Sequence, residues 1–192
     1  MRMQFSGPKA RLARQILRVN HAGEHGAMAI YRAQIAQLGG ARPELTEWLN
    51  ETLGHEMGHK EAFRAAMVER SVTPCGALAV WSVGGSMLGR SMALLGPYGV
   101  MICTAAVERT VHRHLQEQVA FLSGYDDALA DLIREIQKEE NDHLNYAEAR
   151  HNPNSLIART LSLLVAGATV LLIMASTQGS SVGLTGRIKA RH

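Results

Sequence analysis

The sequence predicts an all-α protein in which consecutive helices pack as antiparallel neighbours in a bundle. Ala, Leu, Arg, Glu and Gln fill long stretches with apolar residues at helical spacing, and alternating β-branched runs are almost absent. Hydrophobic residues make up 46 % of the chain and charged residues 19 %, which excludes an intrinsically disordered protein. At 192 residues, the chain is expected to form a single domain, 1–192.

Helix-breaking residues divide the chain into six expected helices. The breaks are Gly39-Gly40 with Pro43, then Pro74, Gly96-Pro97, Gly124 and Asn152-Pro153. They place helices at about 10–38, 44–70, 76–95, 98–123, 126–150 and 155–177. Because the connections are short, sequential helices should run antiparallel.

The third and sixth helices are unusually apolar. Arg90 is the only charged residue from 71 to 107, and no charged residue occurs from 160 to 186. The densest apolar run of the sixth helix, 161–175, is shorter than the roughly 20 residues that span a bilayer. We therefore expect the helices at 76–95 and 155–177 to contact a membrane surface rather than cross it. Two ordinary buried helices are the alternative.

The chain repeats its acidic and histidine residues at an interval of 84 positions. The halves, about 10–70 and 98–150, each contain a helix with one Glu followed by a helix with Glu-x-x-His. Three positions recur: Glu24 with Glu108, Glu56 with Glu140, and His59 with His143. The other histidines do not recur, and His55 aligns with Glu139.

These six residues are predicted to form the donor set of a dinuclear metal site. Residues three apart lie on nearly one face of a helix, so each Glu-x-x-His projects together. Carboxylates turned inward need a cation, and four of them balance two divalent ions. Mixed oxygen and nitrogen donors suit iron or manganese. One Glu from each of two helices and Glu-x-x-His from the other two is the ferritin-like di-iron pattern.

A second motif overlaps the first. Residues 55–59 spell HExxH, in which two histidines would hold zinc and Glu56 would act as the base of a metallopeptidase. This alternative leaves the second Glu-x-x-His, Glu24 and Glu108 unexplained. A ferritin-like iron-binding protein without an organic substrate is a further alternative.

The chain resembles the demethoxyubiquinone hydroxylase family of ubiquinone biosynthesis, a membrane-bound branch of the ferritin-like di-iron proteins. The resemblance lies in RVNHAGEHGA (18–27), EMGH (56–59), AAVERTV (105–111) and EENDH (139–143), in the family's order and spacing. Two positions depart from it: the family usually has an aromatic residue in place of His25 and a tyrosine in place of Leu115.

The resemblance implies a four-helix bundle with two extra membrane-contacting helices and a role for each repeated residue. One iron would be held by Glu24, Glu56, His59 and Glu140, and the other by Glu56, Glu108, Glu140 and His143. The same six residues would be the catalytic ones, with Glu56 and Glu140 bridging the ions. His25, His55 and His114 would lie next to the ligands.

The resemblance also implies the reaction and its partners. The family hydroxylates the ring of a polyprenyl demethoxyubiquinone or demethoxyubiquinol, using O₂ and two electrons from NADH or a reductase. A membrane surface, other ubiquinone-biosynthesis proteins and a second copy of the chain are the expected partners, and nucleic acid is not. The expected location is peripheral to the inner membrane, on the cytoplasmic face in a bacterium or the matrix face in a mitochondrion.

Overall fold

The computed structural model describes residues 7–176, and within them it contains helices and no strand. The helices are α1 (Pro8–Leu38), α2 (Pro43–Glu69), α3 (Leu78–Ala93), α4 (Gly96–Leu122), α5 (Asp127–Glu148) and α6 (Leu156–Ser176), with a 3₁₀ turn at Gly39–Ala41. The predicted all-α class is confirmed, and the helix boundaries fall within about two residues of those expected. Residue 177, the predicted end of the last helix, lies outside the described residues.

Local sequence explains where several helices begin. Pro8, Pro43 and Pro97 each occupy the first turn of a helix, where the missing N–H would have had no partner. Asp126 caps α5 by accepting a hydrogen bond from the backbone N–H of Leu129 at 3.1 Å. These signals fix where the four helices that carry the repeated residues begin.

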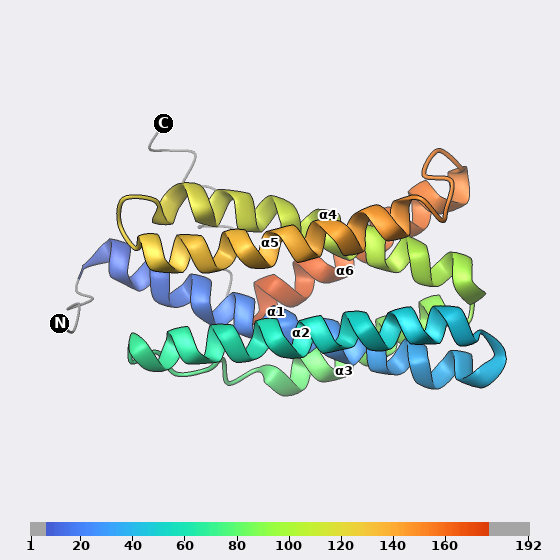
Figure 1. Cartoon of the computed structure of the whole chain (residues 1–192), viewed down its shortest axis with the longest axis horizontal. Coiled ribbons are helices and arrows are strands. Elements are labelled where there is room, and N and C mark those ends of the chain that lie inside the picture. The colour runs from blue at the N-terminus through green and yellow to red at the C-terminus, as the bar shows by residue number, and fades with distance from the viewer. Residues whose placement is uncertain (1–6, 177–192) are drawn as a thin grey trace.

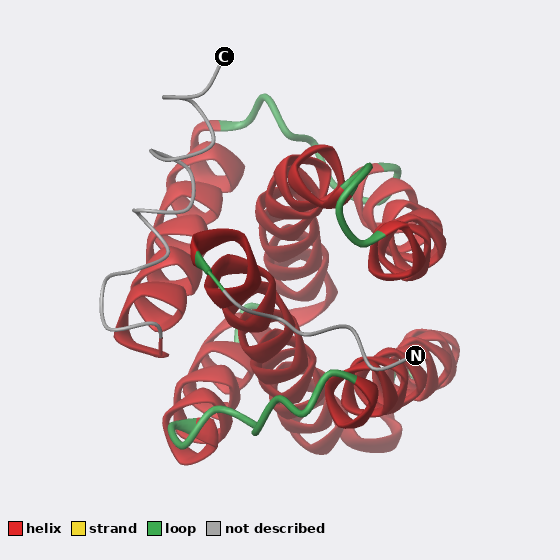
Figure 2. Ribbon diagram, turned by 90° about the vertical axis from the view of Figure 1, so that its left-hand side faces the viewer, coloured by secondary structure: helices red, strands yellow, loops and turns green. Residues whose placement is uncertain are grey.

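Two antiparallel hairpins, α1–α2 and α4–α5, lie side by side and form the four-helix bundle (Figure 1). Each hairpin is followed by a helix that packs back against the hairpin's first member, α3 on α1 and α6 on α4. The same arrangement of three helices therefore occurs in each half of the chain. Figure 2 shows α3 and α6 together on one side of the bundle and α2 and α5 on the other.

Glycines allow α3 to approach α1 closely. A Cβ atom on Gly85 would lie 2.5 Å from the carbonyl oxygen of Gly26, and one on Gly89 would lie 2.4 Å from that of Ile30. Gly26 also leaves room for the ring of Trp81, which is buried against it. Side chains at these positions would push the two helices apart.

The outer surface of α3 and α6 is apolar and exposed. Val83, Met87, Leu163 and Leu171 have 60 %, 66 %, 75 % and 66 % of their surface accessible. Within α6, residues 156–173 have a mean hydropathy of 2.1 and only 22 % of them are buried. By length and composition α6 could cross a membrane, and the expectation that it contacts the membrane surface without crossing stays a prediction.

Candidate metal centre

Six side chains from the four bundle helices converge on the middle of the bundle, and all are buried. Their ligand atoms form two groups, in each of which all atoms lie within 4.8 Å of one another. The first group is Glu24, Glu56, His59 and Glu140, and the second is Glu56, Glu108, Glu140 and His143. We call these position one and position two. These are the two groups that the family resemblance implied for the two ions, and metal binding by them stays a prediction.

The two imidazoles turn the same nitrogen toward the carboxylates. His59 Nδ1 lies 3.1 Å from Glu140 Oε1, and His143 Nδ1 lies 3.4 Å from Glu140 Oε2 and 3.7 Å from Glu56 Oε1. Glu140 and Glu56 thus contact groups from both positions, as bridging carboxylates must.

The outer nitrogens are held by residues of the opposite hairpin. His59 Nε2 lies 3.1 Å from Glu139 Oε2 on α5, and His143 Nε2 lies 3.0 Å from His55 Nδ1 on α2. A partner at the outer nitrogen keeps the proton there and leaves Nδ1 free to bind a metal. His55 thus contacts His143, one of the six predicted ligands.

Glu24 and Glu108, the carboxylates that each belong to only one of the two positions, differ in their hydrogen-bond partners. The buried hydroxyl of Tyr31 donates a hydrogen bond to Glu108 Oε1 at 2.8 Å. The residue that the repeat aligns with Tyr31 is Leu115, which cannot donate to Glu24. The two positions are therefore alike in their ligands and different in their surroundings.

Burial raises the pKa of three of the four carboxyl groups. The pKa of Glu24 rises to about 7, and those of Glu56 and Glu108 lie well above the usual range, with Glu140 adding repulsion in each case. Burial also opposes ionisation of Glu140, but its close contacts with the imidazoles of His143 and His59 outweigh that effect and lower its pKa. Without a cation, the cluster cannot keep four charges in place.

Unpaired buried atoms test whether metal ions fit these groups. Within residues 7–176, five atoms of the cluster have no hydrogen-bond partner: Glu56 Oε1 and Oε2, His59 Nδ1, Glu140 Oε2 and His143 Nδ1. Such atoms are expensive to bury, and here all of them belong to the bridging carboxylates or to the inward imidazole nitrogens. Two divalent cations would satisfy them and balance the four carboxylates.

The other two histidines expected near the ligands, His25 and His114, have different surroundings. His25 turns toward α3, with Nε2 at 2.7 Å from Ser82 Oγ and Nδ1 at 2.9 Å from Lys60 Nζ. His114 lines a pocket beside the cluster. Neither belongs to the two ligand groups.

Sequence reasoning missed two contacts to the ligands. Glu139 carried a signal, since it aligns with His55 immediately before each Glu-x-x-His. Tyr31 lies seven residues after Glu24 on the same face of α1 and contacts Glu108 across the bundle. No pattern within α1 alone could have indicated that partner.

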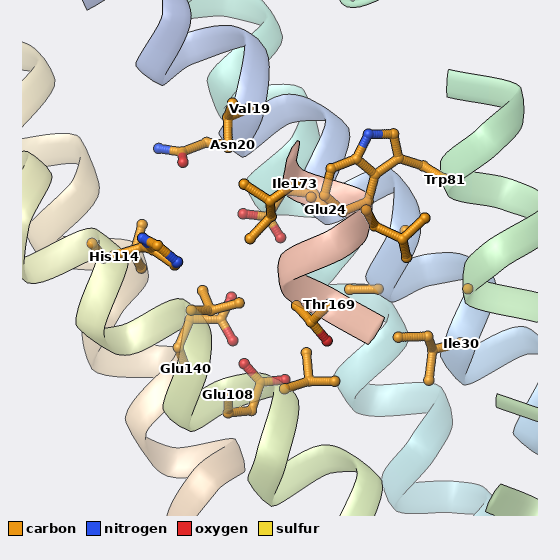
Figure 3. Close-up of a pocket in the computed structure, with 18 of the residues that line it drawn as sticks. Val19, Asn20, Glu24, Ile30, Trp81, Glu108, His114, Glu140, Thr169 and Ile173 are labelled. Atoms are coloured by element: carbon orange, nitrogen blue, oxygen red, sulfur yellow. The ribbon is translucent and has the colours of Figure 1, made fainter. Parts of the chain in front are cut away.

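A mainly apolar pocket leads to the carboxylates from the side covered by α3 and α6. Figure 3 shows Glu24, Glu108 and Glu140 directed into it, with Trp81, Ile30, Thr169 and Ile173 around it. The remaining polar groups include His114 and the amides of Asn20 and Gln118, which bond each other at 2.7 and 3.0 Å.

The zinc-peptidase alternative is not supported by this geometry. His55 lies outside both ligand groups and contacts the outer nitrogen of His143. Of the residues in the HExxH motif at 55–59, Glu56 and His59 belong to the first ligand group, whereas His55 contacts His143 instead.

Comparison with known proteins agrees with the resemblance. The model of the family described as ubiquinone biosynthesis protein COQ7 matches residues 11–176. A rat protein named NADPH-dependent 3-demethoxyubiquinone 3-hydroxylase, mitochondrial, is 37 % identical over 67 % of this chain and 60 % of its own length.

Two further relatives are matched over more of their length. The 3-demethoxyubiquinol 3-hydroxylase of Rhodospirillum rubrum is 35 % identical over 75 % of this chain and 69 % of its own. The Dictyostelium discoideum protein, named like that of rat, is 31 % identical over 88 % and 79 %. The matched part of this chain spans less than two thirds of the mammalian relatives.

Proposed function

The chain belongs to the family of ubiquinone biosynthesis protein COQ7, and from this premise we propose that it is a di-iron monooxygenase. Its substrate would be a demethoxyubiquinone or demethoxyubiquinol with a polyprenyl tail, and the reaction would add one hydroxyl group to the ring. The names of the relatives, which are hydroxylases of this substrate class, support the proposal.

Iron would occupy the two positions. Glu24 and His59 would hold one ion, Glu108 and His143 the other, and Glu56 and Glu140 would bridge them. When bound, two adjacent ferrous ions would supply electrons for the activation of O₂. The role of the protein would be to hold the ligands, which come from four helices, in place and to exclude water.

The observation that carries this proposal is the path from the apolar surface to the carboxylates. The pocket is lined by α1, α3, α4 and α6 and reaches Glu24, Glu108 and Glu140. An isoprenoid tail dissolves only in apolar surroundings, so a substrate of this kind would approach from lipid. The exposed side chains of α3 and α6 are suited to that phase.

Membrane association follows from the same surface. We propose that α3 and α6 lie in the membrane interface, with the chain peripheral to the inner membrane of a bacterium on its cytoplasmic face or of a mitochondrion on its matrix face. The mitochondrial names of the mammalian relatives support the mitochondrial alternative, and the apolar α6 supports contact with a membrane. Other ubiquinone-biosynthesis proteins and a second copy of the chain are further proposed partners.

The electron donor is proposed to be a reduced nicotinamide. The family resemblance implied NADH or a reductase, whereas the name of the rat relative specifies NADPH. The assay should therefore supply NADH and NADPH separately.

The decisive experiment is reconstitution of the purified full chain with ferrous iron without oxygen, followed by O₂, demethoxyubiquinol and a nicotinamide donor. We expect two iron ions per chain and a product one oxygen atom heavier by mass spectrometry. Glu108→Ala and Glu140→Ala should abolish the product, whereas the exposed Glu51→Ala should not. Iron oxidation without a new product would favour an iron-binding protein, and one tightly bound zinc would contradict both.

A further inference from the structure

The two metal positions are related by the internal repeat, so their surroundings can be compared residue by residue. The residue before the Glu of each Glu-x-x-His reaches across to the other hairpin and contacts the opposite histidine. On α5 this residue is Glu139, which contacts His59 of position one. On α2 it is His55, which contacts His143 of position two.

The two contacts have almost the same length and different chemistry. Glu139 Oε2 lies 3.1 Å from His59 Nε2, and His55 Nδ1 lies 3.0 Å from His143 Nε2. The rings of His55 and His143 also stack, with centroids 5.3 Å apart. With a metal ion on the inner nitrogen of each imidazole, the outer nitrogen would carry the proton and each partner would accept it, but only Glu139 brings a negative charge.

A carboxylate at the outer nitrogen makes an imidazole a stronger electron donor at its inner nitrogen. Charge-assisted hydrogen bonds are about twice as strong as neutral ones, and losing the outer partner of a metal-bound histidine typically costs about 10- to 100-fold in metal affinity. The Glu139 side chain is 53 % exposed, so water screens part of its charge. An effect near the lower end of that range is therefore expected.

We propose that the two positions bind divalent metal unequally, with the Glu24–His59 position tighter than the Glu108–His143 position because Glu139 rather than a histidine holds its imidazole. His55 and Glu139 act as positioning residues through the ligands. This inference rests on the proposed metal site and makes a separate statement about it.

Two variants isolate the positions for measurement. Glu108→Ala leaves position one with its full set of ligands, and Glu24→Ala leaves position two with its own. Titrating the metal-free full chain with Co²⁺, followed by visible absorption and competition with a chelator, should show that Glu108→Ala binds one ion about tenfold more tightly than Glu24→Ala.

Exchanging the partners tests the cause while leaving Tyr31 unchanged. His55→Glu in the Glu24→Ala protein should raise Co²⁺ affinity about tenfold, and Glu139→His in the Glu108→Ala protein should lower it similarly. Glu139→Gln keeps an accepting oxygen without the charge, so it should reproduce most of the loss. A structural role alone would not make Glu139→Gln weaken binding while circular dichroism stays unchanged.

Each result decides the inference. Equal affinities in the two isolated positions, or an exchange that leaves affinity unchanged, would overturn it while leaving two ions per chain intact. A wild-type chain that binds no metal would instead refute the proposed function. If an alanine variant does not fold, His55→Glu and Glu139→His alone are compared by two-site titration, and unaltered constants would refute the inference.

Discussion

The two sides of the bundle meet their surroundings in opposite ways. On α2 and α5, ion pairs such as Glu61–Arg64 and Glu135–Lys138 lie exposed on the surface. On α3 and α6, the only charged residues are Arg90 and Arg159, and exposed leucines, valines and methionines cover the rest. One small domain thus presents a charged surface on one side and an apolar surface on the other, a pattern that suits the proposed position at a membrane.

The largest expected effect comes from placing charge on the apolar side. Leu163→Asp with Leu171→Asp should weaken binding to phosphatidylcholine–phosphatidylglycerol vesicles more than about 100-fold, because burying each leucine contributes roughly 1.5–3 kcal/mol. Flotation with vesicles measures the bound fraction. Asn50→Asp with Ala65→Asp adds the same charge to exposed positions of α2 and should not reduce binding beyond general repulsion. If both double variants lost vesicle binding equally, the two sides of the bundle would not differ in their affinity for the membrane.

The next largest effect concerns a charge pair that is buried on the polar side. Arg70, at the end of α2, donates to Asp126 Oδ2 and Oδ1 at 2.8 and 2.9 Å, and the two side chains are 8 % and 0 % exposed. Asp126→Ala leaves the guanidinium unpaired and should lower the free energy of unfolding by about 3 kcal/mol. Urea denaturation measures it, and Glu69→Ala, which removes an exposed partner of Arg70, is the matched control.

The same pair sets a pH dependence. Burial opposes the charge of Asp126, but the hydrogen bonds from Arg70 prevail and hold its pKa below the usual range. Its contribution is therefore fully present above the ordinary aspartate pKa and is lost as the pH falls through the lowered one. In denaturation series at decreasing pH, Asp126→Asn should lack this part of the acid destabilisation. An identical acid profile would contradict the assignment.

A smaller effect tests how α3 is attached. In Gly85→Ala the new Cβ would meet the backbone of Gly26, so we expect a loss of about 2 kcal/mol in unfolding free energy. In the neighbouring Gly84→Ala it would meet the end of the Leu172 side chain, which can move, so the loss should be smaller. Denaturation of both variants in detergent compares them, and equal losses would mean that backbone contact is not the cause.

The smallest effect is expected on the polar surface. Glu61 and Arg64 are 62 % and 59 % exposed and lie one turn apart on α2. Exposed pairs of this kind contribute little, so Glu61→Ala should leave both the denaturation midpoint and vesicle binding unchanged within error. A clear shift in either would show that this surface has a partner.

The six repeated residues were predictable because the same residue types recur at the same spacing in both halves of the chain. Glu-x-x-His alone is common on helix surfaces, but its recurrence with a preceding Glu indicated six buried side chains, and the structure brings those six together. Metal binding by them stays a prediction. Helix boundaries were predictable for a different reason, since Gly and Pro act locally.

Contacts between helices far apart in sequence were not predictable. The hydrogen bond from Tyr31 to Glu108 and the approach of Gly85 to Gly26 depend on how whole helices pack, which no local pattern records. The exposure of α6 is similar: its composition was evident, but the direction of its apolar surface depends on where α4 and α3 lie.

In each of the two groups, three of the four predicted ligands come from one hairpin and the fourth comes from the other hairpin. Two copies of a single hairpin related by a twofold axis would complete the same centre, so the fold is in effect a homodimer joined into one polypeptide. A true homodimer must carry identical residues at both metal positions. Joining the copies removes that constraint, and the pairs His55 with Glu139 and Tyr31 with Leu115 are differences that a homodimer could not hold.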